Sequence, residues 1–595
     1  MAKPRLPESR APKKAAGLGK DNTHREKIAG AKGRGERPEA DLAEDLSAVT
    51  PEPSAPAADS PAPNSGPQTA NSNTPYPSPS PSTSEIELKL SISAEEMERL
   101  PRHPLLKAAT RGRAITRHLY NVYYDTPEFA LRSDKLALRL RRDGAKWIQT
   151  LKTAGRVEGG LHLRQEHDTP VPAQLLNYHA LAQSGASAVF NDAELRTSLQ
   201  AVFVTDFKRS THDIEAASGT LVELCIDSGS VTAGTNTAPI SEVELELKIG
   251  QPGDLLDFAR QLLQQVPMRL EPRSKAERGY ALAAQTGQTP SKSSPPLLHA
   301  DMSVTDAFKQ VVSSCLAHLQ ANERGILQSE DDEYLHQARV ALRRLRSAFS
   351  VFGRALPRAA FEVLLEELRW LGSYLGPARD WDVFATQSLP TLSTAFPRER
   401  GLHWLMETTA ARRADADRGA REAVASVRYT TLLLDVVAAL YRQPWTAFGD
   451  EAAANERARP LPEFAAAILT RHHRKVIKSG REHAELDTAA LHAWRIQVKK
   501  LRYAADFLSS LYEHKATRAY DAALAGLQEM LGSLNDAATV ERLCEGLRHD
   551  PQDASESEIL GVARGWSSAT ARAYIERVPD AWKRFRQCEP FWKGE

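Results

Sequence analysis

The sequence has few cysteines and no long apolar run, which argues against a disulfide-rich protein and against a membrane-spanning one. The 595 residues include only four cysteines, which are far apart and form no CxxC pair, namely Cys225, Cys315, Cys544 and Cys588. Their spacing excludes a disulfide framework and a cysteine-based zinc site, and it fits a reducing compartment. No stretch of about 18 apolar residues is present, and the basic N-terminus lacks the apolar segment of a secretory signal. We therefore expect a soluble, cytoplasmic protein with no membrane partner.

The chain also lacks a net charge of either sign. Its 77 lysines and arginines nearly balance 76 aspartates and glutamates, so the formal net charge is +1. A global electrostatic field therefore cannot attract a polyanion, and any such site must be a local cluster of cations. The length allows two to four folded units at roughly 100–200 residues each.

Residues 1–84 have almost no large apolar side chains. The segment is rich in Lys, Arg, Pro, Ser and Ala, and the part from Pro51 to Ser84 is nearly all small or polar. Such a segment buries too little surface to offset its chain entropy, so we expect a disordered tail. Two roles stay open: a solubilising extension, or a basic arm that contacts an anionic partner.

From residue 85 onwards, two patterns define the folded units. Residues 85–285 contain short runs with a period of two, such as EIELKL (85–90) and EVELELK (242–248), separated by turn residues. This pattern predicts an antiparallel β domain with a few helices. Residues 286–300 read as a linker, and from 301 to 595 the helical period predicts an all-α domain.

The strands of the first domain have one charged face each. Glu85, Glu87 and Lys89 alternate with apolar residues, and the same holds for the run 242–248. A solvent-facing side is the ordinary explanation. However, carboxylates crowd the first and last strands, whereas cations populate the middle ones. A closed barrel with a polar lumen would place both sets around one cavity. There, carboxylates would hold a hard divalent cation, and the basic residues would hold a polyanion.

Several blocks of this domain resemble one known superfamily. The EIELK at 85–89 resembles the ExExK signature of the CYTH superfamily, the triphosphate tunnel metalloenzymes. The blocks YYDTP (123–127), LALRLRRDGAKWIQTLKTAG (136–155), GLHLRQE (160–166), EVELELK (242–248) and RSKAERGY (273–280) resemble its bacterial inorganic triphosphatases. The resemblance implies an eight-stranded antiparallel barrel with a polar lumen that binds triphosphate.

The resemblance also implies roles for individual residues. Carboxylates that match the family's Mg²⁺ or Mn²⁺ ligands are Glu85, Glu87, Asp227, Glu242, Glu244 and Glu246. Cations that match its phosphate-binding lining are Lys89, Arg139, Arg141, Lys152, Arg164 and Lys275. Catalysis is expected from Glu85, Glu87, Lys89, Glu242 and Glu244. The expected reaction is hydrolysis of inorganic triphosphate to pyrophosphate and phosphate by direct attack of water. Thiamine triphosphate or a nucleotide stays open as the substrate.

The second half contains an internal repeat. LHQARVALRRLRSA (335–348) aligns without a gap with LHAWRIQVKKLRYA (491–504), at an offset of 156 residues. LGPARD (375–380) and LGSLND (531–536) repeat at the same offset. Two blocks at one offset predict a duplicated helical unit, with halves at about 301–450 and 460–595.

Each copy of the repeat carries a basic stripe. On a helical wheel, His336, Arg339, Arg343 and Arg346 lie within about 80° of one another, beside an apolar stripe. A solvated helix face is the ordinary explanation for one copy. Duplication with a leading histidine in both copies favours a site, because pseudo-twofold packing would bring both stripes to one groove.

These repeats resemble the CHAD domain, the conserved-histidine α-helical domain. The resemblance implies a helical bundle that binds long-chain polyphosphate. The matching residues are His336, Arg339, Arg343, Arg344, Arg346, Arg379, His492, Arg495, Lys499, Lys500 and Arg502. An alternative is a non-catalytic protein that targets polyphosphate granules. A nucleic-acid site ranks last, because no nucleic-acid motif and few aromatic residues accompany the stripes. The sequence does not determine the oligomeric state.

Overall fold

The computed structural model describes residues 85–153, 155–158, 161–184, 186–216, 219–285, 287–481 and 488–593. Side chains are not described for Arg156, Glu158, Arg164 and Thr488. The expected disordered tail at 1–84 lies outside the described residues.

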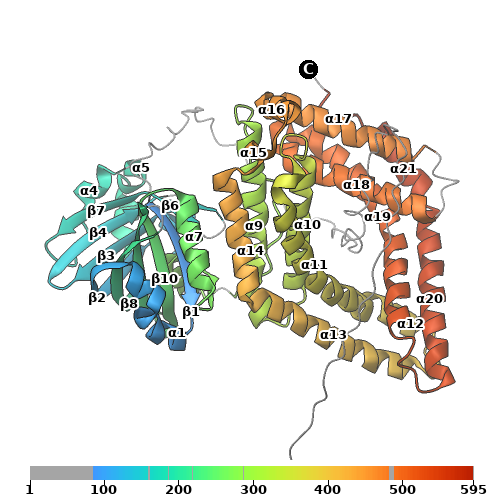
Figure 1. Ribbon diagram of the computed structural model, residues 1–595, viewed down its shortest axis with the longest axis horizontal. Helices are drawn as coiled ribbons and strands as arrows, with labels where there is room; N and C mark the ends of the chain where they lie inside the picture. Colours follow the sequence, from blue (N-terminus) through green and yellow to red (C-terminus); the bar gives the residue numbers. More distant parts are fainter. Residues whose placement is uncertain are drawn as a thin grey trace, which may run out of the picture. The chain divides into compact units, whose positions relative to one another are not determined.

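The first folded part is an antiparallel sheet (Figure 1, blue to green). Its strands are β1 (Glu85–Ile92), β2 (Thr110–Asp125), β3 (Ala137–Asp143), β4 (Lys146–Lys152), β5 (Arg156–Glu158), β6 (Leu161–Arg164), β7 (Glu166–Val171), β8 (Gln200–Glu215), β9 (Leu221–Ala233), β10 (Asn236–Ile249) and β11 (Met268–Leu270). The pairings run in the order β5-β6-β1-β10-β9-β8-β2-β3-β4-β7, and β11 adds to β1.

A bent strand joins the two ends of this order. β6 pairs with β1, whereas β7 pairs with β4, and only Gln165 separates β6 from β7 in the chain. The Gln165 carbonyl also accepts a hydrogen bond from the Thr153 amide at 3.2 Å, which continues the β4 pairing. Counted as one strand, β6 and β7 complete a ring with β1, β10, β9, β8, β2, β3 and β4. The predicted eight-stranded antiparallel barrel is therefore confirmed, and β5 and β11 are short additions.

The outer face of β1 and β10 is apolar and covered by helices. Leu88, Leu90, Val243 and Leu245 are fully buried on this face. They belong to one cluster with the buried face of α7 (Pro252–Leu263), and further cover comes from α1 (Ala94–Arg99) and α2 (Pro104–Ala109). Because side chains alternate along a strand, the charged residues of β1 and β10 must point to the inside. Lys89, Glu242 and Glu244 are buried there, so the solvent-face explanation is wrong for the middle of these strands.

Helix α8 (Lys275–Ala283) packs against β8, β9 and β10. Ser274 and Glu277 form a capping box that fixes the start of α8. Ala276 and Tyr280 then pack with Phe203 and Phe207 of β8, which share a strand face with the inward-facing Arg209. A Cβ at Gly279 would lie 2.2 Å from the Phe203 ring, so glycine permits this close approach. The packing brings the first turn of α8 to the charged interior.

Further short helices of the first part lie between its strands, namely α3 (Ala130–Ser133), α4 (Tyr178–Ala182), α5 (Ser187–Phe190) and α6 (Ala193–Ser198).

The second folded part is helical, as predicted (Figure 1, green to red). The helices of the second part are α9 (Val304–Gln328), α10 (Glu333–Val351), α11 (Glu362–Val383), α12 (Leu389–Ala395), α13 (Leu402–Ala425), α14 (Val427–Arg442), α15 (Trp445–Phe448), α16 (Glu451–Ala458), α17 (Leu461–Ser479), α18 (Thr488–Leu508), α19 (His514–Gly546), α20 (Ala554–Ile575) and α21 (Val578–Gln587).

The two copies of the internal repeat lie on corresponding helices of the second part. The two copies of the basic block lie on α10 and α18, and the two shorter blocks lie on α11 and α19. α9 packs on α10, α17 packs on α18, and α10 contacts α18. Leu342 and Leu345 of α10 are buried, as are Val498 and Leu501, their counterparts on α18. Equivalent apolar stripes therefore anchor both basic helices in the core.

A search for membrane-spanning helices among the described residues found no single helix that is long and apolar enough. One bent pair, α13 with α14, meets the length and composition criteria together, with a bend of 54° between the two helices.

Candidate functional site

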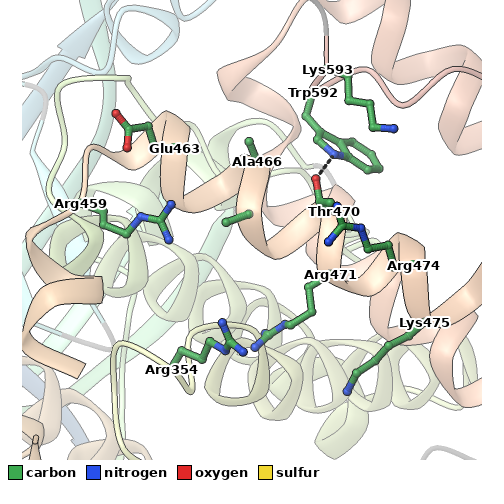
Figure 2. A pocket seen from close by; sticks show the side chains of 11 residues that line it. Arg354, Arg459, Glu463, Ala466, Thr470, Arg471, Arg474, Lys475, Trp592 and Lys593 are labelled. Atoms are coloured by element: carbon green, nitrogen blue, oxygen red, sulfur yellow. Dashed lines mark hydrogen bonds between the residues drawn. The ribbon is translucent and has the colours of Figure 1, made fainter. Parts of the chain in front are cut away.

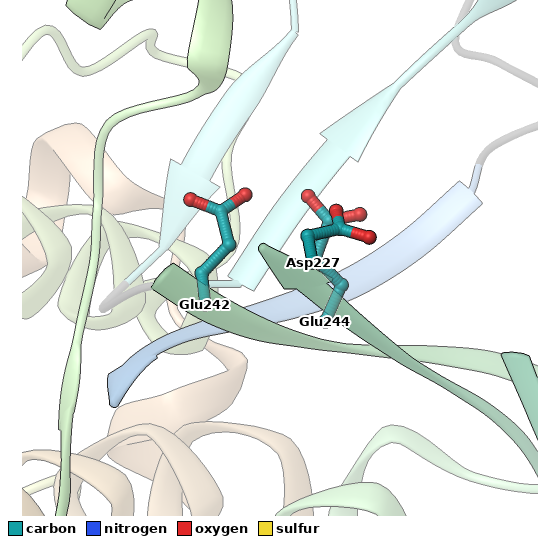
Figure 3. Close-up of side chains that lie close together, drawn as sticks. All are labelled: Asp227, Glu242 and Glu244. Atoms are coloured by element: carbon teal, nitrogen blue, oxygen red, sulfur yellow. The ribbon is translucent and has the colours of Figure 1, made fainter. Parts of the chain in front are cut away.

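Three carboxylates meet inside the barrel (Figure 3). Asp227 comes from β9, and Glu242 and Glu244 come from the adjacent β10, where Glu242 is the cross-strand partner of Asp227. One oxygen from each residue lies within 4.8 Å of the others. Asp227 and Glu242 are fully buried, and Glu244 is 6% exposed. We call Asp227, Glu242 and Glu244 the carboxylate trio.

The trio suits a hard divalent cation. Mg²⁺ and Mn²⁺ prefer oxygen ligands, and buried carboxylates at this spacing repel one another unless a positive charge lies among them. In the structure that charge is Lys275, whose Nζ lies 2.7 Å from Asp227 and 2.9 Å from Glu244 and also contacts Glu242. Burial alone would lower the pKa of Lys275, but the three carboxylates raise it well above its usual value. The donor set therefore fits a metal ion, and Lys275 supplies the same kind of compensation.

Two further cations flank the trio. Lys89 of β1 lies 2.6 Å from Glu87 and also contacts Glu244. Arg209 of β8 donates two hydrogen bonds to Asp227, at 2.8 and 2.6 Å, and contacts Glu244. Burial opposes the charge of Glu244, but Lys275, Lys89 and Arg209 hold the pKa of its carboxyl well below the usual range. This side of the lumen is thus close to electrical balance.

The opposite side of the lumen has an excess of cations. Arg141 donates from Nε to the Asn121 side chain at 3.0 Å, and Arg139 lies 3.6 Å from Glu166, which Lys152 also contacts. Burial, then Arg139 and Arg209, lower the pKa of Arg141 to about 9. Burial, then Arg139, also lower the pKa of Lys152 well below its usual value. Burial is the largest cause of both shifts, and the neighbouring cations add a positive potential that an anion would relieve.

The structure brings most of the predicted barrel residues together, but not all of them. Glu87 lies beside Glu244, and burial and that neighbour raise its pKa. Glu85 is exposed and lies apart from the trio. Glu246 lies 2.6 Å from Lys248, and its electrostatic neighbours are Glu85 and Glu223. The backbone of Arg164 pairs with Glu85, but its side chain lies outside the described residues. The roles of these residues stay predictions.

Two charged residues beside the trio were missed by the sequence analysis. Arg209 ends an otherwise mostly apolar run, and Arg278 lies one helical turn after Lys275. Arg278 donates to Glu242 at 2.8 Å. The spacing of three residues between Lys275 and Arg278 on a predicted helix was a usable signal, because such residues share a face. Arg209 gave no comparable signal without the strand register.

A second group of cations lies between the two repeats of the helical part. Its members are Arg339 and Arg343 on α10, Arg379 on α11, and Arg495 and Lys499 on α18. All five are at most 8% exposed. We call these five residues the cation cluster.

Electrostatics shows that the two halves of the cluster face each other. Burial, then Arg495 and Arg343, lower the pKa of Lys499 well below its usual value. Burial lowers the pKa of Arg495 to about 10, and Arg343 adds to this effect. Arg343 is on α10, whereas Arg495 and Lys499 are on α18. The predicted convergence of the two basic stripes is therefore seen in the structure.

The two leading histidines lie at the cluster. Burial, followed by Arg379, Arg343 and Arg339, lowers the pKa of His336 to about 3. Burial, Arg495 and Lys499 also lower the pKa of His492. Both histidines are therefore neutral at pH 7 in the free protein.

Carboxylates also lie at the cluster, and Asp536 attracts both Arg495 and Lys499. Arg379 contacts Asp382, and Arg339 lies 3.4 Å from Asp380. Burial raises the pKa of Asp536, the repeat counterpart of Asp380, to about 6. Arg495 donates to Asn535, an uncharged residue, at 3.1 Å.

Three other predicted basic residues of the repeats have neighbours outside the cluster. Arg344 is 2% exposed and donates to Asp506 at 3.1 Å and to the Ser294 carbonyl at 2.9 Å. Lys500 is an electrostatic neighbour of His472, and Arg502 of Asp521. Arg346 is buried as well, with 7% of its surface exposed. The polyphosphate roles of Arg344, Arg346, Lys500 and Arg502 stay predictions.

Comparisons with protein families identify both folded parts. Residues 83–280 match the CYTH domain, and residues 310–545 match the CHAD domain. The chain therefore belongs to the proteins in which a CYTH domain is followed by a CHAD domain.

Individual relatives agree with this assignment. The chain is 36% identical over 174 residues to a protein named inorganic triphosphatase from Haemophilus influenzae, a match that covers 28% of this chain and 46% of that protein. The chain thus spans about half the length of that relative. It is 26% identical over 419 residues to an uncharacterized Mycobacterium tuberculosis protein, covering 66% of this chain and 76% of the relative.

A solved structure also resembles the helical part. The CHAD domain of the plant Ricinus communis is 31% identical, and the match covers 51% of this chain and 98% of that domain, with a TM-score of 0.45.

Proposed function

We propose that the barrel is a metal-dependent inorganic triphosphatase. Water attacks the terminal phosphorus, the bridging P–O bond breaks, and the products are pyrophosphate and phosphate. The observation that carries this proposal is the arrangement of a carboxylate trio and a cationic side around one lumen. This combination provides binding sites for a divalent cation and for the phosphate oxygens.

The residues of the lumen would divide the work between them. Arg139, Arg141 and Lys152 would hold phosphate oxygens, which compensates the positive potential that lowers the pKa values of Arg141 and Lys152. The trio would hold Mg²⁺ or Mn²⁺, which supplies charge stabilisation and an activated water when it is bound. Phosphoryl transfer needs mainly positioning and charge stabilisation, so no protein nucleophile is required.

The activity can be tested with a matched pair of variants on β10. Phosphate release from tripolyphosphate with Mg²⁺ or Mn²⁺ is compared for wild type, Glu242→Gln/Glu244→Gln and Glu246→Gln. We expect the double variant to lose activity by a factor on the order of 10³. Glu246→Gln is the single-site comparison: it should retain activity if Glu246, which pairs with Lys248, lies outside the metal site, and lose activity if Glu246 is a metal ligand as predicted. No metal-dependent release by the wild type would leave the non-catalytic alternative, and faster release from thiamine triphosphate or a nucleotide would change the substrate.

We also propose that the cation cluster binds long-chain polyphosphate. The supporting observation is that Arg343 of α10 lies near Arg495 and Lys499 of α18 and adds to the effect of burial in lowering their pKa values. A chain of phosphates would relieve this repulsion. The variant Arg343→Gln/Lys499→Gln should weaken polyphosphate binding about 100-fold. A fluorescent fusion should collect on polyphosphate granules, and the same double variant should not.

A further inference from the structure

A basic cleft lies along α17, outside the cation cluster (Figure 2). Its volume is about 750 Å³. Six cations line it, namely Arg354, Arg459, Arg471, Arg474, Lys475 and Lys593. Within the described part of the chain, the lining contains one carboxylate, Glu463. This charge ratio fits an anionic ligand.

Three separate segments build the cleft. Arg354 follows α10, Arg459 precedes α17, and Arg471, Arg474 and Lys475 lie on α17 itself. The chain end supplies the remaining cation.

The chain end is held in place by Trp592. Its indole N–H donates to the Thr470 hydroxyl of α17 at 2.9 Å, and its ring packs against Tyr520. Lys593 is thereby kept beside the cleft. Because the Trp592 ring is already packed in this way, it is not a free platform on which a nucleobase stacks.

One carboxylate near the cleft, Glu456, forms weak ion pairs with two of the lining arginines. Glu456 lies 4.0 Å from Arg354 and 3.3 Å from Arg459. The side chains of these arginines are 61% and 37% exposed. Exposed ion pairs contribute little free energy, so an incoming anion can replace them at low cost.

The positive potential continues beneath the cleft. His472 of α17 is 4% exposed, and burial followed by Arg471, Lys475 and Lys500 lowers its pKa to about 3. Lys500 lies on α18, next in sequence to Lys499 of the cation cluster. The cleft and the cluster therefore flank the same helix.

We propose that the cleft is a second binding site for a phosphate chain. From Glu463 to Lys475 the lining extends about 18 Å along α17, so a single phosphate contacts only part of it, whereas a chain contacts it throughout. The inference rests on the polyphosphate ligand of the proposed function, but it uses none of the residues of the cation cluster.

The test removes three cations that line the cleft, and it leaves Arg471 and Lys475, the neighbours of the buried His472, unchanged. The cleft variant is Arg354→Gln/Arg474→Gln/Lys593→Gln. The control variant is Arg398→Gln/Arg400→Gln/Arg418→Gln, which removes three exposed arginines outside the lining. Binding of long-chain sodium polyphosphate to the full chain is measured at several salt concentrations, together with tripolyphosphate hydrolysis. Each cation that contacts phosphate adds about 1 to the slope of log affinity against log salt.

We expect the cleft variant to lower the salt slope by up to about 3 and the affinity about 10-fold, with hydrolysis unchanged. The control should retain the wild-type slope. Equal slopes for the cleft and control variants would overturn the inference, and the proposed function would survive if Arg343→Gln/Lys499→Gln still abolished binding. If wild type binds no polyphosphate, the proposed function fails first. A cleft variant that loses binding of a single-stranded oligonucleotide, but not of polyphosphate, would replace this site with a nucleic-acid site.

Discussion

The barrel lumen and the cation cluster both bury arginine and lysine, but they compensate the charge differently. In the lumen, Lys89, Arg209 and Lys275 contact carboxylates, and the pKa values of all three are raised. In the cluster, burial and then the neighbouring cations lower the pKa values of Arg495 and Lys499, although Asp536 opposes this effect. A raised value means that folding favours the charged form, and a lowered value means that folding disfavours it. Similar residues thus stabilise one region and strain the other.

This difference fits two kinds of ligand. A site that holds a metal ion and an anion together needs both signs of charge, and the lumen has both. A site that holds only a polyanion needs mainly one sign of charge, and the cluster has a majority of cations. The comparison leads to predictions in which the same chemical change has opposite effects in the two regions.

The largest effect is expected for Arg209→Gln in the lumen. The substitution leaves Asp227 and Glu244 with one fewer buried cation, so the free energy of unfolding should fall by about 3 kcal/mol. Loss of this charge beside the trio should also lower kcat for tripolyphosphate about 100-fold. Urea unfolding and steady-state kinetics measure the two effects. Arg117→Gln, which removes an exposed pair with Asp143, is the control, and equal destabilisation by both variants would contradict the argument.

Lys499→Gln in the cluster should change stability in the opposite direction. Removing a buried charge among cations relieves repulsion, so the free energy of unfolding without ligand should rise by about 1 kcal/mol. Polyphosphate affinity should fall about 10-fold, because one charge-assisted contact is lost. Urea unfolding with and without polyphosphate gives both numbers. A destabilised variant in the absence of ligand would show that the attraction of Lys499 to Asp536 and its other contacts outweigh the repulsion.

Protonation of His336 should depend on pH differently in the free protein and in the polyphosphate complex. The pKa of His336 is about 3 when folded and roughly 6.5 when unfolded, so the unfolded state binds more protons between these values. This contribution to stability is complete above pH 6.5 and is lost as the pH falls towards 3. Bound polyphosphate would offset Arg379, Arg343 and Arg339, which raises the pKa of His336. Binding then takes up a proton.

Polyphosphate affinity should therefore increase several-fold, up to about 10-fold, between pH 7 and pH 5.5. Fluorescence anisotropy with a labelled long chain measures this change. His336→Gln should flatten the profile, whereas His403→Gln, an exposed histidine outside the cluster, should not. A profile that His336→Gln leaves unaltered would mean that this histidine stays neutral in the complex.

For the barrel, the sequence predicted the carboxylate trio but not the role of Arg209 or the way in which the barrel closes. Alternation along the strands identified the inward face of β10, and the resemblance supplied Asp227, Glu242 and Glu244. The role of Arg209 depends on its register with Asp227, which is a tertiary property that local periodicity does not contain. Closure of the barrel through a strand bent at Gln165 depends on pairings with both β1 and β4, which are equally non-local.

In the helical part, the repeat predicted both basic helices and their convergence. Helix geometry also separates neighbours in sequence, since adjacent residues point about 100° apart. Arg343 therefore faces the cluster, while Arg344 faces Asp506. The resemblance placed both arginines in one binding set, and only the packing of α10 distinguishes them.

Arg344→Gln tests this distinction and should have the smallest effect on binding. Arg344 is almost fully buried and bonds to Asp506 and to the Ser294 carbonyl, so its loss should lower the free energy of unfolding by about 1–3 kcal/mol. Polyphosphate affinity, measured on protein that is still folded, should change less than about 2-fold, because the guanidinium points away from the cluster. Arg343→Gln is the neighbouring comparison, and it should lower polyphosphate affinity more and stability less than Arg344→Gln. A 10-fold loss of affinity in Arg344→Gln would return this residue to the binding set and extend the polyanion site to a second face of α10.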